Sequence, residues 1–178
     1  MHPIIAFYMG ERPDDQGRYL SEILCRDDEW LEQTHNYIQW LFPNSEQSGV
    51  IPNAPTIDND VVRAFVSSNE LRKSLIAAFV RMLKFYGLKL GSNEIVKGSN
   101  WDDRKQNWFT QDGHNSLRIT RILKCLMALG LESEANMFLS ALVHLVSAEN
   151  DSGIFSSSLE YWICVIPNAV RQGDIRFE

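Results

Sequence analysis

One short stretch of the sequence, HNSLRITR, carries side chains that could bind an anion. His114, Arg118 and Arg121 follow one another at intervals of four and three residues. Residues at these intervals share one face of a helix, so the three side chains form a stripe. A guanidinium can fork onto a carboxylate or a phosphate, and free N–H groups at a helix N-terminus also attract anions. The pattern predicts an anion-binding site.

The segment just upstream, WDDRKQNW, adds polar side chains to this candidate site. Arg104 and Asn107 lie one helical turn apart, and Trp101 and Trp108 flank them. A short loop to His114 favours close packing of the two helices, and we expect the tryptophans to form an apolar wall. The predicted cluster is Arg104, Asn107, His114, Asn115, Arg118 and Arg121. The alternative is that the arginines pair with the chain's own acids, such as Asp102, Asp103 or Glu132.

A second His-Asn pair opens the stretch HNYIQWLFP. On a helix over residues 28–42, Glu32, His35 and Gln39 would share a face. A Glu and a His one turn apart can orient a general base, although they can also be two solvated side chains. Buried amides need hydrogen-bond partners, which suits Asn36. We therefore add His35, Asn36, Gln39 and Trp40 to the candidate ligand-binding residues.

Both His-Asn pairs flank long apolar helix faces. Because packed helix axes lie about 8–10 Å apart, we expect the two pairs to lie within roughly 15 Å of each other.

Other kinds of chemistry find no pattern in the sequence. There is no H-E-x-x-H, glycine-rich phosphate loop or G-x-S-x-G, and the four histidines lack metal-ligand spacing. The three cysteines, Cys25, Cys125 and Cys164, form no C-x-x-C and indicate a reducing compartment. We predict no catalytic residue, no metal site and no cofactor.

The elements that must position these side chains are helical. Apolar residues recur at helical spacing between clear breakers, which predicts an all-α fold of about seven or eight helices in one domain over residues 1–178. The expected helices span residues 18–25, 28–42, 58–65, 68–86, 101–109, 114–129, 131–149 and 156–166. A small β-hairpin is predicted over 88–97, irregular structure over 1–17, and a binding loop over 44–58.

Composition narrows the classes of partner. The chain of 178 residues has a net charge of −6, with 44% hydrophobic and 22% charged residues, as in ordinary globular domains. The acidic total makes a nucleic-acid partner unexpected, since phosphate backbones are bound by Lys and Arg. No apolar run approaches the roughly 20 residues of a membrane span, and the N-terminus lacks signal-peptide features. We predict a cytoplasmic location.

Several separated motifs occur in an order that resembles one known family. HNYIQWLFP, SGVIPNAP, MLKFYGLKL, the R-x-x-N of DRKQN and HNSLRITRILKCLMALGL together resemble the conserved region of the opioid growth factor receptor (zeta opioid receptor) family, from about Trp30 to Leu131. The resemblance implies a soluble, mainly helical domain with receptor activity. The animal member is a nuclear and perinuclear receptor for methionine-enkephalin. The present chain shows neither a repetitive C-terminal extension nor a basic import run.

These observations lead to three hypotheses about function. The first is a non-enzymatic, receptor-like binding domain for a peptide or small anionic ligand, in which Arg118 and Arg121 hold the anion. The second is an enzyme of unassigned class that uses His35 or His114 as acid or base. The third is an adaptor for protein or nucleic acid, which would show an exposed apolar patch or a basic stripe.

Overall fold

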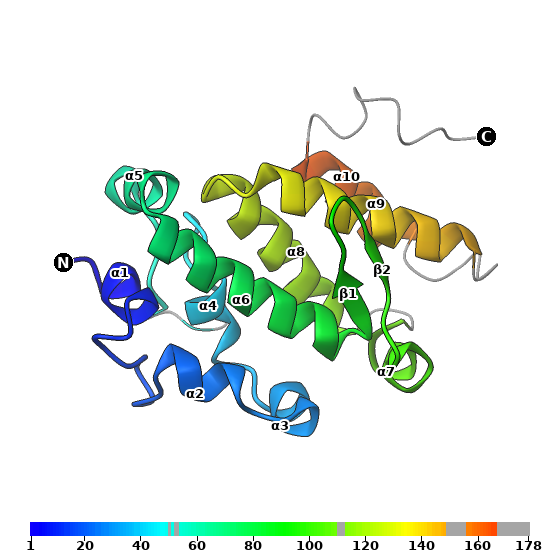
Figure 1. Cartoon of the computed structure of the whole chain (residues 1–178), viewed down its shortest axis with the longest axis horizontal. Helices are drawn as coiled ribbons and strands as arrows, with labels where there is room; N and C mark the ends of the chain where they lie inside the picture. Colours follow the sequence, from blue (N-terminus) through cyan, green and yellow to red (C-terminus); the bar gives the residue numbers. More distant parts are fainter. Residues whose placement is uncertain (50, 52–53, 110–112, 149–155, 167–178) are drawn as a thin grey trace. The chain divides into compact units, whose positions relative to one another are not determined.

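The described part of the chain folds into helices and one small hairpin. The computed structural model describes all residues apart from 50, 52–53, 110–112, 149–155 and 167–178. Within these residues, ten helices accompany a two-stranded antiparallel sheet (Figure 1). The predicted all-α class and the hairpin are confirmed. The chain forms two compact units, residues 1–85 with 128–130, and residues 86–127 with 131–178.

The first unit is organised around one long helix, α6. Its elements are α1 (Pro3–Tyr8), α2 (Leu20–Leu24), α3 (Asp28–Gln33), α4 (Ile38–Leu41), α5 (Asn59–Ser67) and α6 (Asn69–Phe85). Leu71, Leu75, Phe79 and Met82 recur at helical spacing on α6 and are buried. Helices α1, α2 and α5 all contact α6.

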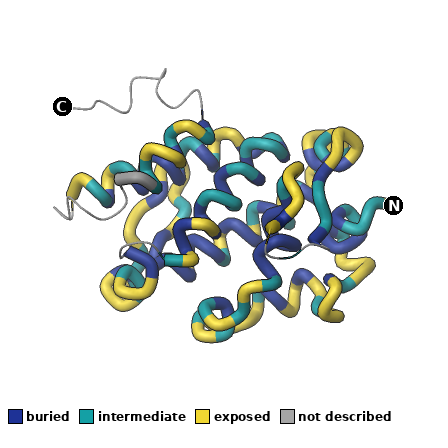
Figure 2. Tube along the Cα trace, turned by 180° about the vertical axis from the view of Figure 1, so that it is seen from behind, coloured by how far each residue is buried: buried dark blue, intermediate teal, exposed yellow. Residues whose placement is uncertain are grey.

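The second unit contains the hairpin and four helices. Its elements are β1 (Leu88–Leu90), β2 (Ile95–Lys97), α7 (Trp101–Trp108), α8 (His114–Ala128), α9 (Glu132–Ala148) and α10 (Ser156–Val165). Strand β2 and helix α10 both contact α9. Buried and exposed positions alternate along the helices, as expected of amphipathic helices (Figure 2).

Two differences from the predicted elements raise the number of helices to ten. Residues 1–17, expected to be irregular, contain α1. His2 caps this helix, because its Nδ1 accepts a hydrogen bond from the Ile4 N–H at 3.3 Å, and Pro3 fits the first helical position. The helix expected over 28–42 is two helices, α3 and α4.

The break between α3 and α4 removes His35 from any helix. Thr34 is extended, with φ −94° and ψ 129°, and ends α3. The Tyr37 hydroxyl then donates to the Leu31 carbonyl at 3.1 Å, which folds the connection back onto α3. The prediction that Glu32, His35 and Gln39 share one helical face is therefore wrong.

In the described part of the 44–58 segment, hydrogen bonds join its first residues to its last ones. The Ile57 N–H donates to the Asn44 carbonyl at 3.1 Å, and Gln47 Nε2 donates to the Ala54 carbonyl at 3.2 Å. Ala54 and Ile57 are each only 6% exposed. These residues contribute to the core of the first unit.

The connection between α6 and the hairpin fixes the place of α7. Gly87 has φ +77°, and a Cβ atom there would lie 2.8 Å from the Trp101 Cα and 3.1 Å from the Arg104 Cβ. Only glycine tolerates both this backbone conformation and this close approach. Helix α7, which carries Arg104 and Asn107, therefore packs directly on the start of the hairpin.

Candidate functional site

The polar cluster predicted from α7 and α8 is partly assembled in the second unit. Arg118 Nη1 donates to Asn115 Oδ1 at 3.3 Å, and Asn115 Nδ2 reaches the Asn107 carbonyl at 3.5 Å. The amide of Asn115 thus links the end of α7 to the guanidinium on α8. Arg118, Asn115 and Asn107 lie together, as the sequence predicts.

Burial divides the members of this cluster into an inner and an outer group. Asn115 is 1% exposed and Arg118 is 4% exposed. His114 and Asn107 are exposed, whereas Arg104 and Arg121 are half-buried. The cluster therefore runs from a buried guanidinium to a polar surface at the first turn of α8.

Aromatic residues hold α7 in place beneath this cluster. Trp108 is 1% exposed and its Nε1 donates to the Tyr86 carbonyl at 2.9 Å. Trp101 packs edge-to-face on Trp108 with ring centroids 6.0 Å apart, and it is 4% exposed. Both tryptophans belong to the core, and the expectation that they form an apolar wall of the site stays a prediction.

Arg121 lies close enough to Cys125 to act on its thiol. Burial raises the pKa of Cys125, and the Arg121 guanidinium opposes that rise because it favours the thiolate. Among the acids considered as partners for the arginines, Asp102 forms an ion pair with Lys105 at 3.4 Å. The choice between ligand binding and internal ion pairs for Arg118 and Arg121 stays a prediction.

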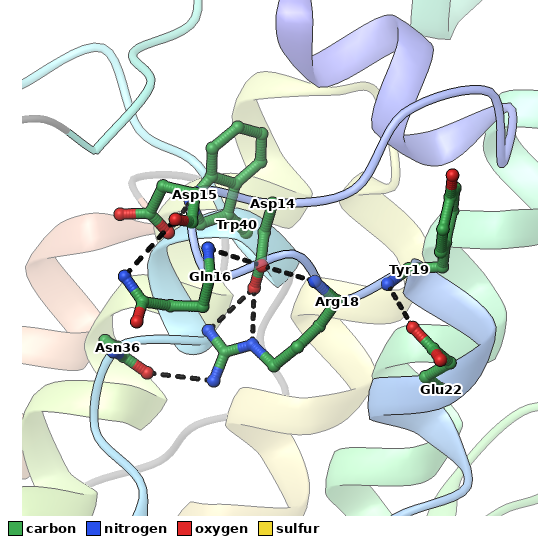
Figure 3. A network of polar contacts seen from close by, with 8 residues as sticks. All are labelled: Asp14, Asp15, Gln16, Arg18, Tyr19, Glu22, Asn36 and Trp40. Carbon is green, nitrogen blue, oxygen red and sulfur yellow. Dashed lines mark hydrogen bonds and ion pairs between the residues drawn. The ribbon is translucent and has the colours of Figure 1, made fainter.

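Asn36 of the first His-Asn pair takes part in a different network, in the first unit (Figure 3). Asn36 Oδ1 accepts a hydrogen bond from Arg18 Nη1 at 3.0 Å. The same guanidinium donates through Nε to Asp14 Oδ2 at 2.7 Å, and its Nη2 lies 2.6 Å from that oxygen. The Asp14 carboxylate has no exposed surface, and its other oxygen accepts the N–H groups of Gln16 and Arg18. Asn36 thus completes a buried ion pair.

Trp40, Gln39 and His35 occupy three different environments in that unit. Trp40 Nε1 donates to Asp15 Oδ1 at 3.0 Å, which ties α4 to the segment before α2. Gln39 is 5% exposed, and its Oε1 accepts no hydrogen bond from the described residues. His35 is exposed, as is His114, and these positions give no support to acid–base catalysis by either histidine.

The two His-Asn pairs lie in different compact units, and the expectation that they meet stays a prediction. The sequence reasoning missed Asp14 and Arg18, which lie in and next to a segment expected to be irregular. Their spacing of four residues was the available signal. The described residues contain no group of three or more His, Cys, Asp or Glu side chains that could hold a metal ion.

The second unit also contains a groove that the sequence did not indicate. It has a volume of about 850 Å³ and lies between the hairpin and α9. None of the predicted site residues lines it. The groove joins residues far apart in the sequence, and neither the hairpin nor α9 alone carries a recognisable binding motif.

The fold and its polar clusters define a mainly helical domain, and no helix in its described part is long and apolar enough to cross a bilayer. The chain belongs to the family described as the opioid growth factor receptor (OGFr) conserved region, whose family model matches residues 5–177. The resemblance seen in the sequence motifs is thereby confirmed.

Curated relatives agree with this assignment. The chain is 36% identical over 169 residues to mouse opioid growth factor receptor-like protein 1, covering 91% of this chain and 36% of that protein. It is also 36% identical over 172 residues to human opioid growth factor receptor, covering 92% of this chain and 25% of that protein. The chain thus spans about a third or less of these relatives. No solved structure matches it significantly.

Proposed function

We propose that this chain is a non-enzymatic, receptor-like binding domain that recognises a peptide or small anionic ligand through the α7–α8 cluster. The observation that carries the proposal is the Arg118 guanidinium, which is 4% exposed and oriented by the Asn115 amide. A guanidinium held in one orientation suits the planar geometry of a carboxylate or phosphate. Half-buried Arg121 supplies a second cation on the same stripe of α8.

Exposed polar groups beside the arginines support this reading. His114, at the start of α8, and Asn107, in the last turn of α7, are both exposed polar side chains beside the arginines. One of the two relatives is named a receptor and the other a receptor-like protein, and both names are consistent with ligand recognition. We include Arg104, Asn107, His114, Asn115, Arg118 and Arg121 in the proposed site.

The remaining parts of the proposal concern the whole chain. Residues 1–178 are proposed to act as one domain, because the family model spans residues 5–177. The proposed ligand-binding residues also include His35, Asn36, Gln39 and Trp40. Of these only His35 is exposed, and Asn36 and Trp40 hydrogen-bond with Arg18 and Asp15. A cytoplasmic location is proposed because all three cysteines are free thiols, as in a reducing compartment.

A thermal-shift screen tests the proposed anion site. The panel holds inorganic phosphate, nucleotides, and short peptides with either a free or an amidated C-terminus. A ligand at 100 times its dissociation constant adds about 2.7 kcal/mol, which raises Tm by roughly 5–10 °C in a chain of this size. Preference for the free carboxylate over the amide would identify the charge that is bound.

Matched variants connect any such rise to the cluster. Arg121→Gln and Arg118→Lys are expected to remove most of the ligand-induced rise in Tm. Arg63→Gln is the control, since Arg63 has 72% of its side chain exposed and pairs with Asp60 on the surface. A rise that persists in both cluster variants would contradict the proposal. So would a panel without any hit, combined with cluster variants that only melt earlier.

A further inference from the structure

The groove between the hairpin and α9 has the size of a binding site. Its volume of about 850 Å³ lies within the range of roughly 300–1,000 Å³ that ligand sites occupy. Strand β2 contributes one wall, and α9 contributes a floor that includes Asn136, Met137, Ser140 and Ala141. Figure 1 shows the hairpin lying across α9, and β2 contacts this helix.

The hairpin register determines which backbone groups of β2 point away from β1. Leu88 pairs with Lys97, and Leu90 pairs with Ile95. Hydrogen bonds from Gly91 N–H to the Glu94 carbonyl, at 2.8 Å, and from Gly98 N–H to the Gly87 carbonyl, at 2.7 Å, mark the hydrogen-bonded pairs.

Hydrogen-bonded and non-hydrogen-bonded pairs alternate along an antiparallel ladder. The pair of residues 90 and 95 lies next to the hydrogen-bonded pair 91 and 94, so it is a non-hydrogen-bonded pair. The N–H and C=O of Ile95 therefore point outward from β2, away from β1.

Three polar groups of two residues, Ile95 and Asn136, have no hydrogen-bond partner at this groove in the described part of the chain. Ile95 is 7% exposed, and no described residue outside the hairpin forms a hydrogen bond with its backbone. Asn136 Oδ1 on the groove floor is fully buried and accepts no hydrogen bond from the described residues. Asn136 Oδ1 has no accessible surface, so an occupant of the groove does not reach it. Polar groups of buried residues are normally paired, so the outward N–H and C=O of Ile95 point to an occupant that supplies backbone-like donors and acceptors.

We propose that an extended peptide segment of a protein partner binds in this groove as a third strand on the outer edge of β2. Such strand addition uses main-chain hydrogen bonds for affinity and pockets for alternate side chains for specificity. Met137, Ala141 and Leu145 line the groove and offer apolar contacts to every second side chain of the segment. The proposal concerns a site separate from the α7–α8 cluster.

The charges around the groove indicate which charged residues the bound segment carries. Glu94 and Glu132 both line the groove and are exposed. The Lys97 ammonium lies over the Trp101 ring, 5.0 Å from its centroid. Lys97 also lines the groove, so its Asp, Glu, Lys and Arg side chains (two Glu and one Lys) sum to a net charge of −1. This small negative excess favours a segment that carries Lys or Arg at positions that alternate with apolar residues.

A designed peptide tests the proposal directly. The probe is a fluorescein-labelled peptide of alternating valine and lysine, and binding is followed by fluorescence anisotropy. A twin peptide carries N-methyl groups on alternate residues, which removes the N–H groups along one edge only. Because each strand-addition contact is a hydrogen bond, the twin is expected to bind about tenfold more weakly or worse. A second twin with glutamate in place of lysine is also expected to bind more weakly.

Three variants and one spectroscopic probe test whether the peptide binds in the groove. Ser140→Trp fills the groove and is expected to abolish binding, whereas Ser67→Trp, an exposed position on α5, is expected to leave it unchanged. The Ile95 amide is expected to shift in the NMR spectrum and to gain protection from hydrogen exchange when the peptide is added. The probe peptides are amidated at the C-terminus, so they lack the carboxylate that the proposed anion site would bind. Arg121→Gln is therefore expected to leave binding of the valine–lysine probe unchanged, which separates this site from the proposed anion site.

Four outcomes would overturn the proposal. They are no binding at millimolar peptide, equal binding of the N-methylated twin, binding that survives Ser140→Trp, and an Ile95 amide that does not respond. Sedimentation analysis adds a fifth outcome: a concentration-dependent dimer lost in Ile95→Pro would assign the β2 edge to a second copy of this chain.

Discussion

The Arg18 guanidinium donates to the Asn36 side-chain oxygen at 3.0 Å while it forms an ion pair with the Asp14 carboxylate at 2.6 Å. Asp14 has no exposed side-chain surface, so Arg18 and Asn36 together neutralise and orient a buried charge. The Asn of the first His-Asn pair therefore has a structural role. The arrangement makes the connection between α3 and α4 depend on a residue eighteen positions upstream.

Breaking this buried pair is expected to destabilise the protein strongly. Arg18→Ala leaves the Asp14 carboxylate buried without its cation, which costs about 3–5 kcal/mol. The double variant Asp14→Ala/Arg18→Ala is expected to lose less than the sum of the two single variants, because the uncompensated charge is gone. Urea unfolding followed by circular dichroism measures all three free energies.

The exposed pair of Arg63 and Asp60 is the matched control. Its side chains are 72% and 79% exposed, and Arg63→Ala is expected to cost less than about 1 kcal/mol. Additive losses at Asp14 and Arg18, or losses no larger than at Arg63, would contradict a buried and coupled pair.

The same contact explains why the sequence did not predict the break between α3 and α4. Residues 28–42 carry apolar residues near helical spacing, and a local window predicts one helix. Tertiary hydrogen bonds override that preference: Asn36 binds Arg18, and Trp40 binds Asp15. In a local stretch of sequence, a polar side chain that bonds to a distant residue cannot be distinguished from one that is solvated.

Where local signals suffice, prediction and structure agree closely. The helix expected over 114–129 is found as α8 (His114–Ala128), and the hairpin expected over 88–97 is found as β1 and β2. Apolar periodicity and turn residues determine these elements without long-range partners. The linkage of Asn107, Asn115 and Arg118 was predictable for the same reason, since a short connection brings α7 and α8 together. The groove could not be predicted from the sequence, because it depends on how the hairpin lies on α9.

Substitution of Gly87 tests the close packing that positions α7. Gly87→Ala places a Cβ atom 2.8 Å from the Trp101 Cα in a backbone with φ +77°, so both strain and a clash with the backbone result. The left-handed conformation alone costs about 1–2 kcal/mol for a residue with a Cβ atom. With the clash added, we expect a loss of about 3 kcal/mol in unfolding free energy.

Gly10 is the control for the backbone conformation alone. Its φ is +73°, and a Cβ atom there would meet nothing within 4 Å. Gly10→Ala is expected to cost about 1 kcal/mol, with thermal unfolding as the measurement. Equal losses at the two glycines would show that α7 does not pack tightly against Gly87.

The Asp58 carboxylate, which caps the start of α5, is expected to make the stability of the protein depend on pH. Its carboxylate accepts the N–H groups of Asp60 and Val61, at 3.0 and 2.9 Å, and chiefly the Val61 bond lowers its pKa. A carboxylate with a lowered pKa stabilises the folded state above its unfolded pKa of about 4, and this contribution disappears as the pH falls through the folded value. The wild-type protein should therefore exceed Asp58→Ala in Tm at neutral pH, and the difference should shrink below about pH 4.

Asp58→Asn separates the charge of this cap from its hydrogen bonds. Asparagine also accepts hydrogen bonds at an N-cap but does not titrate in this range. The difference in Tm between Asp58→Asn and Asp58→Ala should therefore stay constant as the pH falls. A wild-type advantage over alanine that does not change between pH 7 and 3 would contradict the role of the carboxylate.

Cys125 provides a test of burial on the inner face of α8. Cys125 is fully buried, and burial raises its thiol pKa, whereas Cys25 and Cys164 are exposed. Alkylation requires both access and the thiolate form, so iodoacetamide should modify Cys125 at least about a hundredfold more slowly than the other two at neutral pH. Mass spectrometry of peptides from a quenched time course measures the three rates separately. In urea above the unfolding midpoint the three rates should become similar, which serves as the control for intrinsic reactivity. A Cys125 that reacts in the folded protein as fast as Cys25 would show that α8 does not bury this side, and would also remove the basis for a buried Arg118 on the same helix.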